Sequence, residues 1–246
     1  MFTNNKINIV MPMAGRGGRF SQFNLPKPLI KIDDKAMVWH AINSLKLDGN
    51  YIYITRKYDD HSLNIELNNI LSEVTPDCDI IQINHVTEGP ACSVLLAKEL
   101  INNNKPLIIT NCDRISYWNS QDFLNAINQE DVDGLVVTWN KIATTESFIE
   151  LDENGYGIRL VEKEIISDQP LNGIHYWKMG KYFVESAEKM ILKNIRIKNE
   201  FYVSMTYNQM INDGYKIKTY KLKPNQHFSV GDPEDLKKYL QWKNSK

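Results

Sequence analysis

The sequence contains no long hydrophobic run. No apolar stretch approaches the length needed to cross a bilayer, and the residues before Ile7 form no hydrophobic leader. We therefore expect a cytoplasmic protein with no membrane partner. Charge of one sign is also scarce, since 29 Lys and Arg residues nearly balance 30 Asp and Glu residues and leave a formal net charge of -1. This balance gives no broad electrostatic reason to bind nucleic acid, so no nucleic-acid partner is expected.

Cysteine and histidine are too few and too scattered to predict a metal site. The cysteines have neither CxxC spacing nor an even number, which argues against a zinc site and against a disulfide framework: Cys78, Cys92 and Cys112. The histidines show no metal-ligand spacing, and we assign none of them to catalysis: His40, His61, His85, His175 and His227.

Apolar, β-branched runs alternate with stretches of helical period through about the first 140 residues. This alternation predicts βαβ units and a largely parallel sheet. The expected strands cover residues 7–11, 51–55, 79–84, 106–111 and 134–139. The expected helices cover residues 38–47, 62–73, 91–101 and 121–129.

The pattern changes after Trp139. Two short runs, 148–151 and 156–163, flank the turn sequence Asp-Glu-Asn-Gly, which predicts an antiparallel hairpin. An apolar run at 172–177, helices at 181–193 and 200–212, a strand at 216–220 and a final helix at 233–242 should follow. With no disordered linker in the sequence, we expect one domain over residues 1–246.

A glycine-rich loop follows the first expected strand, within residues 11–29. Gly15, Gly17 and Gly18 fall within four positions, and glycine lets backbone amides turn inward to form a nest for phosphate oxygens. Positive side chains follow in the same stretch: Arg16, Arg19 and Lys27. The stretch therefore predicts a phosphate-binding loop.

Two familiar phosphate loops do not fit this stretch. The Gly-Lys-Ser/Thr of a P-loop is missing, and Phe20 stands where a dinucleotide-binding loop needs its third glycine. Lys27 lies between Pro26 and Pro28, whose fixed φ angles can aim its ammonium at a phosphate. A solvated lysine in an ordinary proline-rich turn is the alternative.

The loop and the lysine together resemble a known signature. Gly15-Arg16-Gly17-Gly18-Arg19-Phe20 followed by Pro26-Lys27-Pro28-Leu29 is similar to the opening motif of the sugar-1-phosphate nucleotidyltransferases, or nucleoside-diphosphate-sugar pyrophosphorylases. Within them, the chain resembles a glucose-1-phosphate nucleotidyltransferase-like subgroup associated with capsular polysaccharide. The likeness extends over nearly the whole chain, with weaker matches at Ala91 to Lys98, Asn111 to Asp113, Val161 to Lys163, Asn199 to Val203 and Gly231 to Leu236.

The resemblance implies an α/β fold with a Rossmann-like (GT-A-like), mixed but mostly parallel sheet flanked by helices. Residues 1–140 would form the nucleotide-binding core. Residues 141–246 would form the acceptor-binding part, a small β-hairpin and helical sugar-binding subdomain, and the C-terminal helix. The partners would be a nucleoside triphosphate and a small phosphorylated acceptor such as a sugar 1-phosphate, and the chain could form a homodimer.

The resemblance also implies roles for single residues. The catalytic cations would be Arg19, Lys27 and Lys163. The nucleotide would be bound by Ala14, Gly15, Arg16, Gly17, Gly18, Glu88, Gly89, Pro90 and Ala91. The acceptor would be bound by Asp113, Asn172, Gly173, Glu200 and Tyr202. The cofactor Mg²⁺ would be held by Asp113 and Asp232.

Both proposed metal ligands have a second interpretation. Asp113 follows an expected strand, where ligands of α/β sheets collect, but it could equally cap the next turn. At the late motif, Ser229 takes the place where related enzymes carry a metal-binding aspartate. Asp232 either replaces that ligand or caps the helix that begins at Pro233, and we favour the cap.

The implied reaction needs no general base. A phosphate monoester has a second pKa near 6 and attacks the α-phosphorus of the triphosphate as an anion, expelling pyrophosphate. A pyrimidine triphosphate (CTP, UTP or dTTP) is favoured by the likeness to capsule-pathway enzymes. Two other functions stay open. Asn111-Cys112-Asp113 resembles a degraded D-x-D motif of nucleotide-sugar-dependent glycosyltransferases, and the altered late motif is compatible with a non-catalytic nucleotide-sensing subunit.

Overall fold

The structure is a computed structural model that describes residues 6–140 and 142–245. The segment before Lys6, where we expected no hydrophobic leader, lies outside the described residues. Within the described ranges, no helix combines the length and the hydrophobicity needed to span a bilayer.

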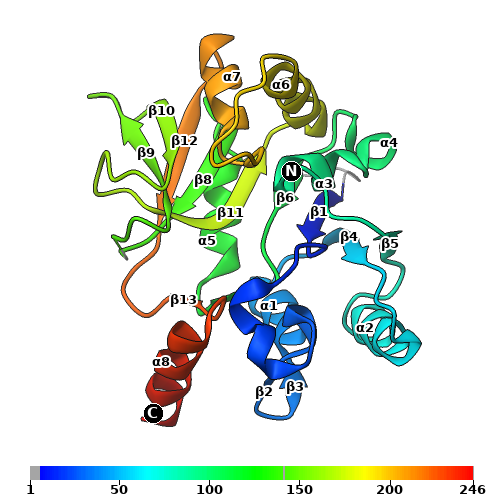
Figure 1. Ribbon diagram of the computed structural model, residues 1–246. Coiled ribbons are helices and arrows are strands. Elements are labelled where there is room, and N and C mark those ends of the chain that lie inside the picture. The colour runs from blue at the N-terminus through cyan, green and yellow to red at the C-terminus, as the bar shows by residue number, and fades with distance from the viewer. Residues whose placement is uncertain (1–5, 141, 246) are drawn as a thin grey trace.

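A seven-stranded sheet runs through the molecule (Figure 1). Its strands lie in the order β12 (Ile217–Lys221), β8 (Gly134–Thr138), β11 (Leu171–Trp177), β6 (Leu107–Ile109), β1 (Ile7–Pro12), β4 (Gly49–Arg56) and β5 (Asp79–Ile83). Strand β11 runs antiparallel to its neighbours β6 and β8, and the other neighbouring pairs are parallel. The expected α/β class with a mixed, mostly parallel sheet is confirmed.

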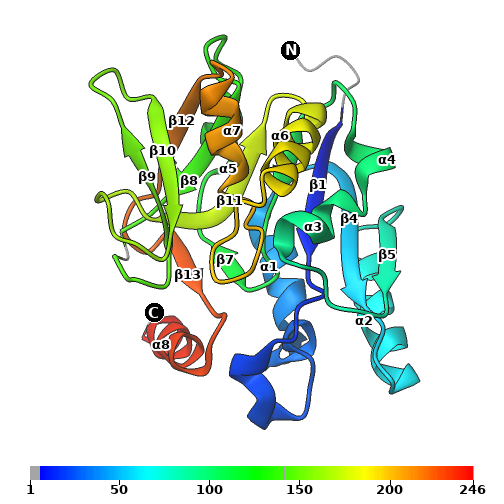
Figure 2. The same ribbon diagram turned by 45° about the horizontal axis from the view of Figure 1, so that its top comes forward.

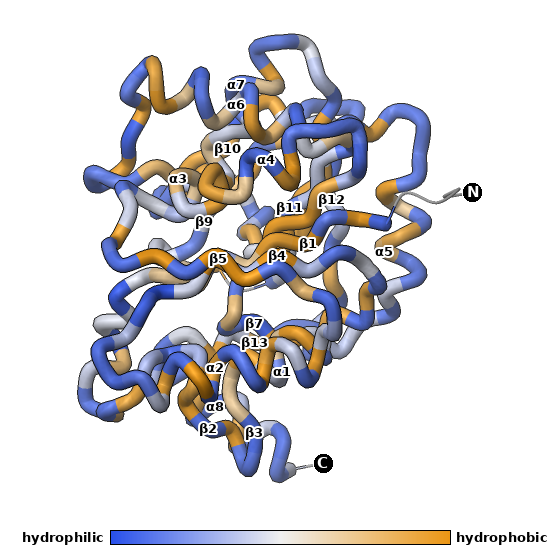
Figure 3. Tube along the Cα trace, turned by 90° about the vertical axis from the view of Figure 1, so that its right-hand side faces the viewer, coloured by the Kyte–Doolittle hydropathy of each residue, from blue (hydrophilic) through white to orange (hydrophobic). Residues whose placement is uncertain are grey.

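Both faces of the sheet are covered by helices, because alternate residues of each strand point to opposite faces. Ile9 and Tyr53 pack against α1 (Met37–Leu45), α2 (His61–Val74) and α5 (Ser120–Ile127). Val10 and Ile52 pack on the other face, against α3 (Pro90–Leu95), α4 (Lys98–Ile101), α6 (Gly180–Leu192) and α7 (Thr206–Asn212). Figure 3 shows the hydrophobic strands β1, β4 and β5 between these two layers.

Two of the expected helices were wrong in extent. The single helix expected over 91–101 is divided into α3 and α4, because the chain tightens at Leu96 and Ala97, whose amides bond to carbonyls three residues back. The helix expected to begin at residue 200 begins at Thr206 instead. The chain is not helical in the expected first turn, because the Phe201 N–H donates to the Glu88 carbonyl at 2.9 Å instead.

Several short strands complete the fold. The predicted hairpin is confirmed as β9 (Ser147–Leu151) paired with β10 (Gly157–Glu162) (Figure 2). The sequence did not reveal β2 (Lys31–Ile32) and β3 (Lys35–Ala36), or the pairing of β7 (Arg114–Ser116) with β13 (His227–Ser229). The last helix, α8 (Pro233–Asn244), follows β13 and packs its Tyr239 against Phe228.

Candidate active site

The candidate site lies at the carboxyl ends of β1 and β6. These strands are neighbours, but β1 continues into elements on the β4 side and β6 into elements on the other side. In open α/β sheets, such a switch point leaves a crevice beyond the strand ends in which ligands collect. The glycine-rich loop leaves β1 here, and Asp113 follows β6.

A cavity of about 280 Å³ opens at this switch point. Five of the predicted nucleotide-binding residues line it, namely Ala14, Gly15, Gly17, Gly89 and Pro90. The predicted cations Arg19 and Lys27 and the predicted ligand Asp113 line it too. The structure therefore brings the glycine-rich loop, the Gly89-Pro90 turn and the end of β6 around one hollow.

The other four predicted nucleotide-binding residues do not line this cavity. Arg16 and Gly18 are on the exposed side of the loop. Glu88 is exposed and pairs with Arg196 at 2.6 Å. Ala91 is fully buried, and its N–H donates to the Phe201 carbonyl at 3.0 Å, so it ties the turn to the segment that precedes α7.

The loop is anchored by the residue that breaks the dinucleotide pattern. Phe20 is 2% exposed and packs in a small core that includes Met37, Val230 and Tyr239. Its N–H donates to the Gly17 carbonyl at 2.9 Å, and Gly17 has a φ of 63°, in the left-handed region that glycine tolerates. Phe20 thus fixes the short helix η1 (Gly18–Phe23) to the body of the protein.

Lys27 and Asp113 form an ion pair inside the cavity. Lys27 begins a second short helix, η2 (Lys27–Leu29), and its Nζ lies 2.7 Å from Asp113 Oδ2. Burial alone would lower the pKa of Lys27, but the Asp113 carboxylate outweighs it and raises that pKa above the ordinary value. Burial likewise opposes ionisation of Asp113, yet Lys27 and Arg114 hold its pKa well below the usual range. Both groups are therefore charged at neutral pH.

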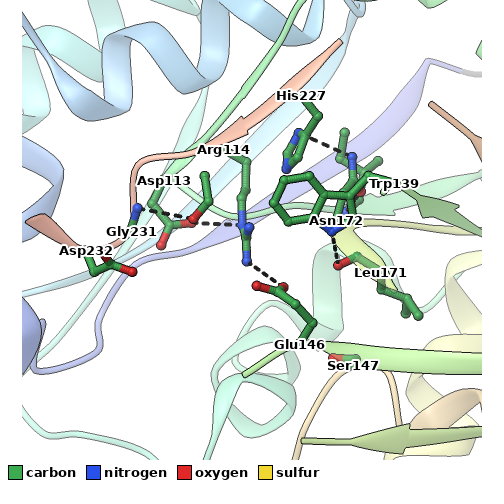
Figure 4. Close-up of polar contacts among 12 residues, drawn as sticks. Asp113, Arg114, Trp139, Glu146, Ser147, Leu171, Asn172, His227, Gly231 and Asp232 are labelled. Atoms are coloured by element: carbon green, nitrogen blue, oxygen red, sulfur yellow. Dashed lines mark hydrogen bonds and ion pairs between the residues drawn. The ribbon is translucent and has the colours of Figure 1, made fainter. Parts of the chain in front are cut away.

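The backbone of the late motif packs against Asp113. The Val230 N–H donates to the Asp113 carbonyl at 2.9 Å, and a Cβ on Gly231 would come within 2.3 Å of Asp113 Oδ2. Glycine at 231 therefore makes room for the carboxylate. In Figure 4, Gly231 lies beside Asp113 and Asp232 lies beyond it.

Asp232 caps helix α8. Its Oδ1 accepts a hydrogen bond from the Asp235 N–H at 2.9 Å, as a cap does, and its Oδ2 lies 3.9 Å from an Arg19 guanidinium nitrogen. Arg19 is 68% exposed, so this contact is weak. The helix cap that we favoured for Asp232 is therefore present, and the Asp232 Oδ2 atom faces Arg19.

A second cavity of about 360 Å³ adjoins the first and shares five residues with it: Arg19, Pro90, Asn111, Arg114 and Glu200. Six of the predicted residues line this cavity, namely Arg19, Pro90, Lys163, Gly173, Glu200 and Tyr202. Asn172 is fully buried, and its side-chain oxygen accepts from the Ile174 N–H at 2.9 Å. Gly173 has a φ of 93°, and a Cβ there would press on the Asn111 amide.

Lys163 reaches across the second cavity to Tyr202. Its Nζ donates to the Tyr202 hydroxyl and lies 4.6 Å from the centre of that ring. The backbone of Lys163 is left-handed, with φ 61°, and its N–H donates to the Glu146 carbonyl at 2.9 Å. A left-handed backbone is uncommon for a residue other than glycine, and here it fixes the direction from which the Lys163 side chain leaves the chain.

Four charged or titratable residues of the second cavity were missed by the sequence reasoning: Arg114, Glu146, Glu162 and His175. Glu162 is 8% exposed, accepts from the hydroxyls of Ser147 and Ser204, and has a pKa raised by burial. Its place in the Val161 to Lys163 match could have revealed it. Arg114 directly follows Asp113, whereas nothing in the sequence around Glu146 distinguishes it.

The residues around Asp113 fit a magnesium ion in part. Among the described residues, no group of three or more His, Cys, Asp or Glu side chains could hold a metal ion. Asp113 Oδ1, however, is buried and has no hydrogen-bond partner in the described parts of the chain. Since Mg²⁺ commonly takes one or two carboxylates and completes its shell with phosphates and water, this orphaned oxygen fits a substrate-bound Mg²⁺.

The whole chain aligns with solved nucleotidyltransferase structures. A nucleoside-diphosphate-sugar pyrophosphorylase from Vibrio cholerae RC9 superimposes with a TM-score of 0.80 at 19% identity, over 95% of this chain and 99% of that one. A putative glucose-1-phosphate thymidylyltransferase from Bacillus anthracis gives 0.76 at 15% identity, over 96% and 94%. This chain has the nucleotidyltransferase fold.

A third structure extends the same finding. The inositol-1-phosphate CTP transferase from T. maritima gives a TM-score of 0.75 at 13% identity, over 98% of this chain and 96% of that one. The sequence itself matches no protein-family model, and no curated protein matches it. The resemblance inferred from the glycine-rich loop is thus confirmed for the fold. A shared fold does not by itself assign a function to the two cavities, so their function is argued from their residues.

Proposed function

We propose that this protein is a Mg²⁺-dependent nucleotidyltransferase that joins a nucleoside triphosphate to a sugar 1-phosphate, or to a similar small phosphate, and releases pyrophosphate. The observation that carries the proposal is the pair of adjoining cavities with Arg19 in the wall of both and the Lys27–Asp113 pair in the first. Two anionic substrates repel, and cations shared between two pockets are what bringing them together requires.

The residues divide the work between the two substrates. The amides of the glycine-rich loop and Arg19 hold the β- and γ-phosphates that leave, and Lys27 steadies the phosphates that react. Lys163 approaches the acceptor phosphate from the second cavity. No side chain has to remove a proton, because the attacking phosphate is already largely dianionic at neutral pH.

Asp113 would hold the magnesium ion, and its Oδ1 is the atom that supports this assignment. When bound, Mg²⁺ would neutralise phosphate charge and stabilise the oxygens of the displacement. Asp232 is the second candidate ligand, and its cap to α8 leaves only Oδ2 for that role.

We further propose a pyrimidine triphosphate as the nucleotide. Three structures with the same fold are a glucose-1-phosphate thymidylyltransferase, a UDP-glucose pyrophosphorylase and an inositol-1-phosphate CTP transferase, whose names all refer to pyrimidine nucleotides. From the resemblance of the sequence we also propose a role in capsule or surface polysaccharide synthesis and a homodimer. The cytoplasmic location is proposed from the lack of a long hydrophobic run.

One assay tests the proposal against its alternatives. The protein is incubated with Mg²⁺, each common triphosphate and a panel of sugar phosphates, and pyrophosphate is measured. Release with a pyrimidine triphosphate supports the proposal. A glycosyltransferase would instead consume a nucleotide sugar without releasing pyrophosphate, and a sensing subunit would bind nucleotide without turnover.

Variants connect that activity to the site. Lys27→Ala and Asp113→Ala should lose nearly all turnover while keeping the fold, as circular dichroism would show. Lys31→Ala is the matched control, since Lys31 lies near Lys27 in sequence but pairs with Glu66 on the surface at 2.9 Å. Pyrophosphate release that persists in either site variant would overturn the residue assignments.

A further inference from the structure

Arg114 is a largely buried cation with two donor atoms that make no hydrogen bond in the described part of the chain, although its Nη2 donates to Glu146 at 3.5 Å. The side chain is 15% exposed, and its Nε and Nη1 atoms are buried without a hydrogen-bond partner among the residues that the structure describes. Its two ion pairs are long, at 3.6 Å from Nε to Asp113 Oδ1 and 3.5 Å from Nη2 to Glu146 Oε2. Buried donors are rarely left unpaired, because desolvation is then uncompensated, so the geometry points to a ligand that completes them.

The guanidinium lies on the acceptor side of the site. Figure 4 shows the side chain extending from the backbone beside Asp113 toward Glu146. Its Nε lies 3.7 Å from the position that a Cβ would take on Gly173, in the wall of the second cavity. Arg114 lines both cavities, and its guanidinium reaches the wall of the second one, where the proposed function places the acceptor.

The second cavity is lined by further polar residues around Arg114, and two other cations, Lys163 and Arg19, also lie in its wall. Glu146 is 7% exposed, and Glu162 is 8% exposed with two hydroxyl donors. His175 lines the same cavity, and its Nδ1 is also buried without a partner in the described part of the chain. Burial and the charge of Arg114 lower the pKa of His175 to about 3, so its ring is neutral at pH 7.

We propose that the acceptor carries a carboxylate in addition to its reacting phosphate and that Arg114 binds this carboxylate. The inference rests on the proposed function and narrows its substrate class. A neutral sugar would leave the guanidinium donors only weakly satisfied. A second phosphate would bring two charges beside Glu146, whereas a carboxylate brings one and is the natural partner of an arginine.

The test compares acceptors that differ only in this group. Glucuronic acid 1-phosphate is glucose 1-phosphate with a carboxylate in place of its hydroxymethyl group, and glucose 1,6-bisphosphate carries a phosphate there instead. Phosphorylated hydroxy acids extend the panel to carboxylates on smaller frames. We expect kcat/KM to be at least tenfold higher for the best carboxylated acceptor than for the best neutral or bisphosphate acceptor, the factor given by one hydrogen bond to a charged group.

Three variants locate the effect. Arg114→Gln should lower kcat/KM for the carboxylated acceptor at least tenfold more than it lowers kcat/KM for glucose 1-phosphate, while Arg114→Lys should recover part of the loss. Glu146→Gln removes the competing carboxylate and should lower KM for the carboxylated acceptor. Arg159→Gln is the control, because Arg159 is an exposed residue of β10 that pairs with Glu150 of β9 and does not line the cavity.

The outcomes separate this inference from the proposed function. If the best acceptor is a neutral sugar phosphate or the bisphosphate, the inference is overturned and the proposed function is not. An equal loss of kcat/KM for all acceptors in Arg114→Gln would also overturn the inference, because it would assign Arg114 to the reacting phosphate. Absence of pyrophosphate with every acceptor would overturn the proposed function. In that case, binding is read from Tm: an increase that carboxylated phosphates cause and Arg114→Gln abolishes supports the inference, and an unchanged Tm overturns it.

Discussion

Lys27 Nζ lies 2.7 Å from Asp113 Oδ2, although the two residues are 86 positions apart in the chain. The pair joins the end of the glycine-rich loop to the end of strand β6. It balances charge while no phosphate is present, and each partner holds the other in its ionised form. The site is therefore charged and partly organised before substrates bind.

The first prediction concerns the stability of this pair. Lys27→Met leaves the Asp113 carboxylate buried with less compensation, and we expect it to lower the free energy of unfolding by about 3 kcal/mol. Lys27→Met combined with Asp113→Asn should restore part of that loss, since both charges are then removed. Urea denaturation measures the three free energies. The exposed pair of Lys31 and Glu66 is the control, and Lys31→Met should cost less than about 1 kcal/mol.

A second prediction tests the close approach of the late motif to Asp113. Gly231→Ala would place a Cβ within 2.3 Å of Asp113 Oδ2 and push the carboxylate away from Lys27. We expect kcat to fall at least tenfold and the Mg²⁺ concentration needed for half-maximal activity to rise. Ser229→Ala, two residues away on β13, should change neither value more than about twofold. Normal activity in Gly231→Ala would show that the carboxylate position is not critical.

A third prediction concerns the contact between the two halves of the site. Gly89 has a φ of 137°, and a Cβ there would lie 2.4 Å from the Phe201 nitrogen. Gly89→Ala should therefore break the two backbone hydrogen bonds that Phe201 makes with Glu88 and Ala91. Because the same contact positions both cavities, KM should rise for the nucleotide and for the acceptor.

The control for Gly89→Ala is another glycine with positive φ. Gly155 has a φ of 82° but no atom within 4 Å of its Cβ position, so Gly155→Ala carries the backbone strain without the clash. Steady-state kinetics with each substrate varied in turn measures both KM values. Equal effects of the two variants would mean that strain, rather than the contact with Phe201, is responsible.

A fourth prediction gives the pH dependence of stability. Burial lowers the pKa of His175 to about 3, from an ordinary value of 6.5 in the unfolded chain. Between these values the unfolded state binds the extra proton, so this contribution to stability is complete above about pH 6.5 and is lost as the pH falls toward 3. The slope from one such proton is about 1.4 kcal/mol per pH unit.

Replacing the titrating ring tests this assignment. His175→Gln should flatten the dependence of unfolding free energy on pH between 6.5 and 4.5, when urea denaturation is repeated across that range. His85→Gln is the control, since His85 is exposed and bonds only to the neighbouring Asn84 among the described residues. An unchanged slope in His175→Gln would assign the acid sensitivity to other groups.

Much of the fold could be predicted because the sequence patterns of its strands and helices are local. Strand β1 and helix α2 were predicted nearly in full, since a buried parallel strand needs a continuous apolar run and a helix needs a repeating apolar stripe. The failures have a common cause. The segment around Phe201 has a helical pattern, but its amide and carbonyl bond to a loop more than a hundred residues earlier.

The sequence by itself predicted the glycine-rich loop after β1, because closely spaced glycines and a lysine held between prolines constrain a local backbone directly. Only the tertiary structure decided what faces that loop. The Lys27–Asp113 pair, the close packing of Gly231 on Asp113 and the long contact of Arg114 with Glu146 all join distant segments. Such contacts depend on which strands lie side by side, and the order of strands in a sheet is set by packing of the whole chain rather than by the residues of any one strand.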